Sequence, residues 1–192
     1  MIKYYQMKKA TVFLAFILLI GFVFSQTPID YDNIDYLLLD TLIIVEVNKR
    51  RVVIGNPKIN YSPTIRKGVS IHQTDILVRE DKVYHPSTDS LYKKLFLEIK
   101  KECSEKYNKS IYCTTSATEV CIMIPAVIVK TYEELSVYMV DMWETSKPHK
   151  DILLNYAWSS DFVIGASSIQ YGTYNSYPAF YGSVQIVSPA LD

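Results

Sequence analysis

The chain has 192 residues, of which 49% are hydrophobic, and it carries 20 basic and 20 acidic side chains. Lys3, Lys8 and Lys9 lie in the first nine residues, so the rest of the chain is mildly acidic, with 17 basic against 20 acidic residues. This balance argues against a nucleic acid as the partner.

The N-terminal segment is typical of a secretory signal peptide. Its three lysines precede an almost wholly apolar run over residues 10–24, which is shorter than the roughly 18 to 20 residues that span a bilayer. Val23 and Ser25 place small residues before the expected cleavage point. We therefore expect residues 1–25 to be a signal peptide and residues 26–192 to form one secreted or periplasmic domain, with no stable membrane span after cleavage. An uncleaved membrane anchor is the alternative.

Two amphipathic helices are predicted first in the exported part. The first covers residues 35–51, and its predicted buried face consists of Leu38, Leu42 and Val45. Ser62 is the expected N-cap of the second helix, with Pro63 at its first helical position. The apolar stripe predicted for this second helix consists of Ile65, Val69, His72 and Ile76.

Two further helices come next along the chain. The third is expected to begin near Asp89 or Ser90, with a buried face of Leu91, Leu95 and Ile99. Thr131 and Glu134 form a capping box that predicts the start of the fourth helix, and Pro148 ends or kinks that helix. The side chains expected along one side of the fourth helix are Leu135, Tyr138, Met139, Met142 and Trp143.

Three cysteines lie beyond the N-terminal segment, and export would allow a disulfide to persist. A bridge between Cys103 and Cys113 would close a short polar loop, although the sequence equally allows both thiols to be free. Cys121 lies in an apolar run and is expected to be a buried small hydrophobe. The spacing lacks the paired CxxC pattern of a zinc site.

Near the C-terminus the apolar period changes from helical to alternating, which predicts two strands. The alternating residues are Phe162, Ile164 and Ala166 in one segment, and Phe180, Val184 and Ile186 in the other. Residues 171–176 are the expected turn, and residues 121–129 fit either a buried strand or an apolar loop. Helices followed by antiparallel strands indicate an α+β domain whose layers share one core.

Seven short segments match known sequence motifs, and they occur in the same order as those motifs. They are residues 46–51, 59–66, 83–87, 118–120, 143–153, 162–165 and 181–185. The longest of them reads WETSKPHKDIL. Together they resemble the bacterial branch of the CAP superfamily, the SCP-like extracellular proteins related to cysteine-rich secretory proteins, antigen 5 and pathogenesis-related 1. The resemblance covers nearly the whole exported part. It implies a three-layer α-β-α sandwich with an antiparallel sheet and a central cleft.

The cleft of that superfamily presents two histidines and two acidic residues, which in some members hold a divalent metal. By the resemblance, His85 and His149 match the histidines and Glu119 matches the first glutamate. This set could hold zinc or another divalent metal and leave one position open to water. The second glutamate of the family falls at Ser146 here, and Glu144 points about 200 degrees away around the helix.

Each of these three residues also has an ordinary structural interpretation. His85 could bond a loop backbone, His149 could be an unremarkable polar residue at a helix start, and Glu119 could lie in an exposed loop. An extracellular or envelope binding module for a lipid, a glycan or a protein is the favoured function, because the carboxylate pair is incomplete. A metal-dependent, peptidase-like hydrolase and a purely structural envelope protein are the alternatives.

Overall fold

A computed structural model describes residues 26–85, 89–155 and 162–191. The predicted signal peptide, residues 1–25, lies outside the described residues. The helices are α2 (Tyr36–Val53), α3 (Pro63–Ile65), α4 (Ile71–Glu80), α5 (Asp89–Tyr107), α6 (Tyr132–Thr145) and α7 (Lys147–Lys150), with π-helical segments at Arg66–Ser70 and Asp151–Asn155. The strands are β1 (Ile59–Tyr61), β2 (Ile111–Pro125), β3 (Val163–Tyr174) and β4 (Tyr177–Leu191).

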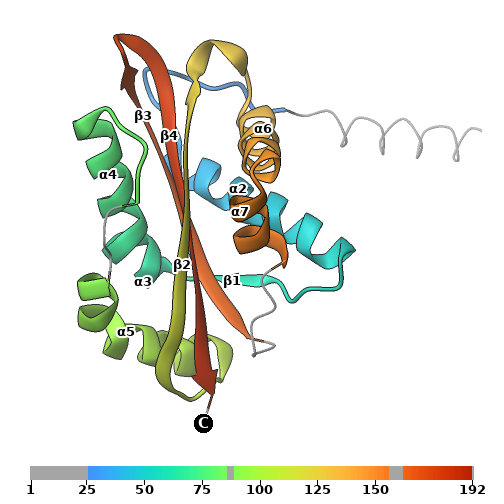
Figure 1. The fold of residues 1–192 in the computed structure, drawn as a ribbon, viewed down its shortest axis with the longest axis vertical. Coiled ribbons are helices and arrows are strands. Elements are labelled where there is room, and N and C mark those ends of the chain that lie inside the picture. Colours follow the sequence, from blue (N-terminus) through green and yellow to red (C-terminus); the bar gives the residue numbers. More distant parts are fainter. Residues whose placement is uncertain (1–25, 86–88, 156–161, 192) are drawn as a thin grey trace, which may run out of the picture.

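The four strands form one sheet in the order β1-β3-β4-β2 (Figure 1). Strands β3 and β4 are antiparallel neighbours, as expected, and β2 pairs with β4 in the same antiparallel way; all three strands are long. The short strand β1, which the sequence pattern did not predict, adds to β3 in parallel, with Ile59 opposite Val163. Residues 121–129, for which the sequence allowed a strand or a loop, are strand up to Pro125 and then form a 3-10 turn at Ala126–Ile128. The α+β class is confirmed.

The β3–β4 hairpin is tighter than the sequence pattern indicated. Strand β3 continues to Tyr174, and only Asn175 and Ser176 form the turn, with φ angles of 48° and 69°. Two successive left-handed residues are the signature of the two-residue hairpin turn whose twist matches that of the strands. The expected turn over residues 171–176 is therefore mostly strand.

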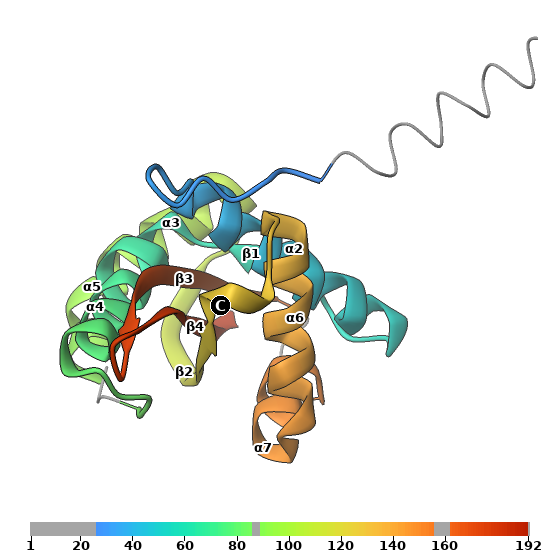
Figure 2. The ribbon, with the colours of Figure 1, turned by 90° about the horizontal axis from the view of Figure 1, so that it is seen from above.

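Helices cover both faces of this sheet (Figure 2). Helices α2 and α6 bury Leu39, Ile43, Leu135, Met139 and Trp143 in a cluster with Val120, Ile124 and Val184 of the sheet. Val69, Tyr92, Ile99 and Cys103, from the π-helical segment and α5, pack in a second cluster with Ile164, Ala166 and Val187. Strands β3 and β4 are buried over most of their length because both faces are covered.

The predicted caps position these helices. Ser62 Oγ accepts a hydrogen bond from the Ile65 amide at 3.1 Å, with Pro63 in the first turn. Thr131 and Glu134 form the reciprocal capping box at the start of α6. Helix α6 ends at Thr145, and the short α7 restarts with Pro148 in its first turn. These boundaries depend on local hydrogen bonding, which explains why they could be predicted from sequence.

The predicted buried faces of two helices are wrong in part. His72 is exposed, whereas Gln73 and Leu77 are fully buried, because the π-helical segment before α4 adds one residue to a turn and so rotates the whole of α4 about its axis. In α2 the fully buried residues include Ile43 and Val47, and Val45 is 43% exposed. Nine of the twelve positions from Tyr36 to Val47 are apolar, so spacing alone could not select the face.

Cys103 and Cys121 are both buried free cysteines. The possible bridge from Cys103 involves Cys113, whose side chain lies outside the described part of the structure, and Cys103 itself is free. Cys103 lies in the apolar contact between α5 and the sheet, where a small hydrophobic side chain fits. Among the helices of residues 26–85, 89–155 and 162–191, none has the length and hydropathy that a bilayer span requires.

Candidate functional site

The carboxylate of Glu119 is at the centre of a buried polar network. Its side chain is only 10% exposed. It accepts hydrogen bonds from the amide groups of Gln73 and Gln185, from the Cys121 thiol at 3.1 Å, and lies 2.9 Å from His85 Nδ1. A buried carboxylate requires such partners, because desolvating the charge alone is costly. Glu119 thus lies on a strand face and not in an exposed loop.

The two glutamine amides each donate to a different oxygen of this carboxylate. Gln185 lies directly opposite Glu119 in the β2–β4 register. The Tyr92 hydroxyl of α5 donates to Gln185 Oε1 at 2.7 Å, which leaves the Gln185 NH₂ group directed at Glu119. Gln73 reaches the other carboxylate oxygen from α4. The position of Glu119 is thereby fixed by two helices and a neighbouring strand.

The two histidines of the expected site lie next to each other. His85 comes after α4, and its side chain is 55% exposed. Its ring centroid is 6.2 Å from that of His149 in α7, in an edge-to-face arrangement. Burial, together with the positive charge that His85 can carry, lowers the pKa of His149. His85, Glu119 and His149 are therefore neighbours, although only His85 contacts Glu119 directly.

Cys121 also belongs to this group, which the sequence pattern did not predict. It lies two residues after Glu119 on β2, so both side chains lie on the same face of the strand. One ligand atom each from His85, Glu119 and Cys121 lies within 4.8 Å of the others. We call these residues, with His149, the polar cluster. The Glu-x-Cys spacing in a strand is the sequence signal for this pair. The prediction that Cys121 is buried is confirmed, but its polar contacts were not predicted.

The thiol of Cys121 is protonated in this environment. Burial raises the pKa of Cys121, and the adjacent Glu119 carboxylate raises it further. The thiol therefore donates to the carboxylate and is not a free nucleophile. Imidazole nitrogen, carboxylate oxygen and sulfur are nevertheless all ligands that suit zinc, so the residues present fit a metal of this kind.

Glu144 lies outside the polar cluster, as its helical position predicted. It pairs with Arg50 of α2 and lies 3.8 Å from Lys150. The guanidinium group of Arg50 also pairs with the carboxylates of Glu46 and Asp141. Glu144 therefore belongs to an ion-pair network that joins α2 to α6. Within the described residues, Glu119 is the one carboxylate of the metal-compatible group.

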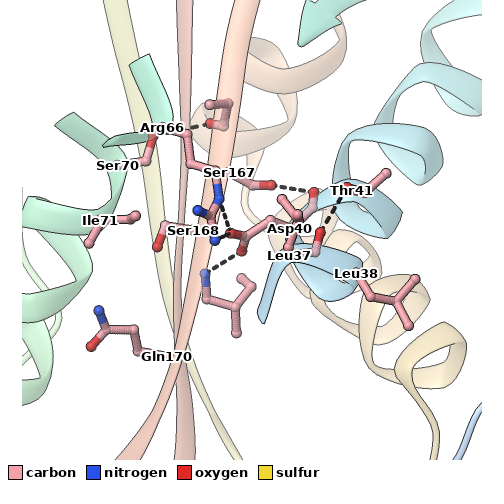
Figure 3. Close-up of polar contacts among 12 residues, drawn as sticks. Leu37, Leu38, Asp40, Thr41, Arg66, Ser70, Ile71, Ser167, Ser168 and Gln170 are labelled. Atoms are coloured by element: carbon pink, nitrogen blue, oxygen red, sulfur yellow. Dashed lines mark hydrogen bonds and ion pairs between the residues drawn. The ribbon is translucent and has the colours of Figure 1, made fainter. Parts of the chain in front are cut away.

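A second buried polar group, centred on Asp40, has a structural role (Figure 3). The Asp40 side chain is fully buried and pairs with Arg66 at 2.5 Å, while the Ile169 amide donates to it at 2.7 Å. The Ser167 hydroxyl donates to the Asp40 carbonyl oxygen at 2.6 Å. Burial raises the pKa of Asp40 to about 7, and the Arg66 guanidinium opposes this rise. These bonds fasten α2 and the π-helical segment to β3.

An apolar hollow of about 280 Å³ lies beyond the polar cluster, at the tip of the β3–β4 hairpin. Its lining includes Met123, Pro125, Val127, Tyr174, Tyr177 and Pro178. Met123 lies two residues after Cys121 and so shares its strand face. Tyr177 is 73% exposed and Val127 is 83% exposed. Exposed apolar side chains grouped in this way are typical of an interaction surface.

Comparison of the sequence with protein-family models gives no match, and comparison with curated proteins gives none either. Among solved structures, an outer surface protein from Borrelia burgdorferi is similar, with a TM-score of 0.47 and 12% identity, over 79% of this chain and 92% of that one. An extracellular protein containing an SCP domain from Bacillus anthracis has a TM-score of 0.48 and 14% identity, over 82% of this chain and 44% of that one. At these scores and identities, neither similarity establishes a family or a function.

Proposed function

We propose that this chain is an exported binding module of the CAP type, with a divalent metal ion held at the polar cluster. The observation that supports this most directly is the contact between His85 and Glu119, with His149 beside them. These three residues lie in sequence segments that are far apart in the chain. Their proximity is what a shared site requires.

A binding role fits the cluster better than hydrolysis does. A metal-dependent hydrolase needs a group that accepts a proton from the attacking water. Glu119 would itself be a ligand of the ion, and Glu144 is paired with Arg50 away from the polar cluster. Neither carboxylate is then placed to accept that proton. The chemistry that a bound ion would supply here is the anchoring of an anionic or polar ligand group.

The ligand would be an extracellular or envelope molecule, whether a lipid, a glycan or a protein. The apolar hollow supports a binding surface, because it continues the strand face that carries Glu119 and Cys121. Tyr174 and Tyr177 offer rigid amphipathic rings there, and tyrosine is enriched at protein interfaces. The N-terminal segment, with its three lysines before an apolar run, supports export.

Zinc titration by calorimetry tests the metal part of this proposal. The unmodified protein should bind one zinc ion, and His85→Ala should weaken binding strongly because a ligand nitrogen is removed. The chain has three histidines, and His72 is exposed on α4 and does not belong to the metal-compatible group, so His72→Ala is the matched control. Binding that is lost equally in both variants, or absent from the unmodified protein, would rule out the site.

The choice between a binding module and a hydrolase is tested separately. The zinc-loaded protein should turn over none of a panel of peptide and ester substrates, with or without a chelator. Turnover that disappears with the chelator and with His85→Ala would identify a hydrolase instead. A pull-down from envelope extract that returns nothing above background would favour the purely structural alternative.

A further inference from the structure

We infer that Cys121 is a sulfur ligand of the metal at the polar cluster, so that the ion is bound through nitrogen, oxygen and sulfur. This inference rests on the proposed function, because it assigns a further ligand to the same site. A sulfur ligand changes the class of ion expected at the site. A thiolate favours soft metal ions, whereas histidine and carboxylate ligands alone do not give this preference.

The positions of the three ligand groups carry the inference. Cys121 Sγ lies 3.1 Å from Glu119 Oε1, and His85 Nδ1 lies 2.9 Å from the same oxygen. Donor atoms around a tetrahedral zinc ion, at bond lengths of about 2.0 to 2.3 Å, are roughly 3.3 to 3.7 Å apart. The existing hydrogen bonds therefore need to open by only a few tenths of an ångström, on the order of one rotamer adjustment.

Gln73 provides an independent observation at the same place. Its side chain is fully buried in α4, and its Nε2 group lies 3.6 Å from Cys121 Sγ as well as donating to Glu119. Metal ligands are commonly oriented by such hydrogen-bond donors behind them. Gln73 Oε1 is buried and has no hydrogen-bond partner within the described part of the chain. A water molecule bound to the metal would supply a donor to this acceptor.

The proton balance is simple. The Cys121 thiol binds the metal as a thiolate, so its proton leaves to solvent when the sulfur–metal bond forms, and no oxidant or reductant is required. Thiolate is a soft ligand that favours zinc and related ions such as cobalt and cadmium. Magnesium and calcium prefer an environment of oxygen ligands, and we expect them to bind far more weakly here.

Cobalt(II) titration of the full chain, followed by absorption and calorimetry together, tests the inference. A cobalt–thiolate bond produces a sulfur-to-metal charge-transfer band in the near ultraviolet, which nitrogen and oxygen ligands do not produce. We expect this band in the unmodified protein and its loss in Cys121→Ser, with affinity falling at least about tenfold. Cys103→Ser is the matched control, since Cys103 is also buried and free but lies in the apolar contact of α5. It should keep the band.

The two measurements separate the possible failures. Cobalt binding without the charge-transfer band, or a band that survives in Cys121→Ser, would overturn the assignment of Cys121 and leave the His85 and Glu119 site intact. The absence of any binding heat with cobalt or zinc would overturn the metal centre itself. Circular dichroism of Cys121→Ser shows whether the variant is folded. If it is not, Cys121→Ala and cadmium-113 NMR of the unmodified protein give the same decision through the chemical shift of a sulfur-bound ion.

Discussion

Nδ1 of His85 lies 2.9 Å from Oε1 of Glu119, although 34 residues of chain separate them. The contact forms because the chain that leaves α4 passes the face of β2 on which Glu119 lies. Gln73, on the same helix, reaches the same carboxylate oxygen. The buried carboxylate and the exposed imidazole therefore form one unit, with one side packed in protein and the other open to solvent.

Replacing Glu119 by Gln should destabilise the fold as well as weaken metal binding. The Gln73 and Gln185 amides now donate to the two oxygens of Glu119. In the variant one of these oxygens becomes an NH₂ group, which cannot accept, so a buried hydrogen bond is lost. We expect the free energy of unfolding to fall by about 1 to 3 kcal/mol, measured by urea denaturation. Glu105→Gln, at a side chain that is 67% exposed, should change it by less than about 0.5 kcal/mol. Equal stability of the two variants would contradict the described network.

Glu144→Gln should leave zinc affinity unchanged. Glu144 contacts Arg50 and Lys150 and no member of the polar cluster, so removing its charge affects only the ion pairs between α2 and α6. Those pairs are partly exposed, and the expected loss of stability is at most about 1 kcal/mol. Calorimetry and urea denaturation on the same preparation check both statements. A clear loss of zinc affinity would show that Glu144 reaches the metal after all.

Asp40→Ala should be far more damaging than any change at the polar cluster. It leaves the Arg66 guanidinium without its buried partner and the Ile169 amide without its acceptor. Breaking a buried ion pair on one side costs about 3 to 5 kcal/mol. Asp32→Ala, at an exposed position before α2, is the control and should be nearly neutral. Thermal and urea unfolding of the two variants provide the comparison.

The ring of His149 should titrate below the ordinary histidine value in an NMR pH series. Burial and the nearby His85 both disfavour its charged form, so the folded state binds fewer protons than the unfolded state between the lowered pKa and about 6.5. The contribution of His149 to stability is thus complete above about pH 6.5 and is lost as the pH falls through that window.

A substitution at His85 tests the cause of this shift. His85→Ala removes one source of positive charge beside His149, so the pKa of His149 should rise toward its ordinary value while the part due to burial remains. The same substitution at His72 should leave the His149 titration unchanged. A His149 pKa that does not respond to His85→Ala would mean that the two rings do not interact.

The sequence by itself determined the features that depend on neighbours along the chain. Ser62 with Pro63, and Thr131 with Glu134, marked two helix starts because capping is a hydrogen bond across three residues. His85, Glu119 and His149 were also predicted from sequence, through a resemblance to other proteins and not through spacing or periodicity.

The tertiary structure alone decided which faces are buried and which side chains meet. The π-helical turn at Arg66–Ser70 turns His72 outward and Gln73 inward. The regular spacing of an α-helix does not predict the extra residue of such a turn. The short strand β1 exists only because β3 is there to pair with it. Cys121 is a neighbour of His85 because strand pairing and helix packing bring distant residues together. The hydrophobic pattern of a single segment cannot specify such a long-range contact.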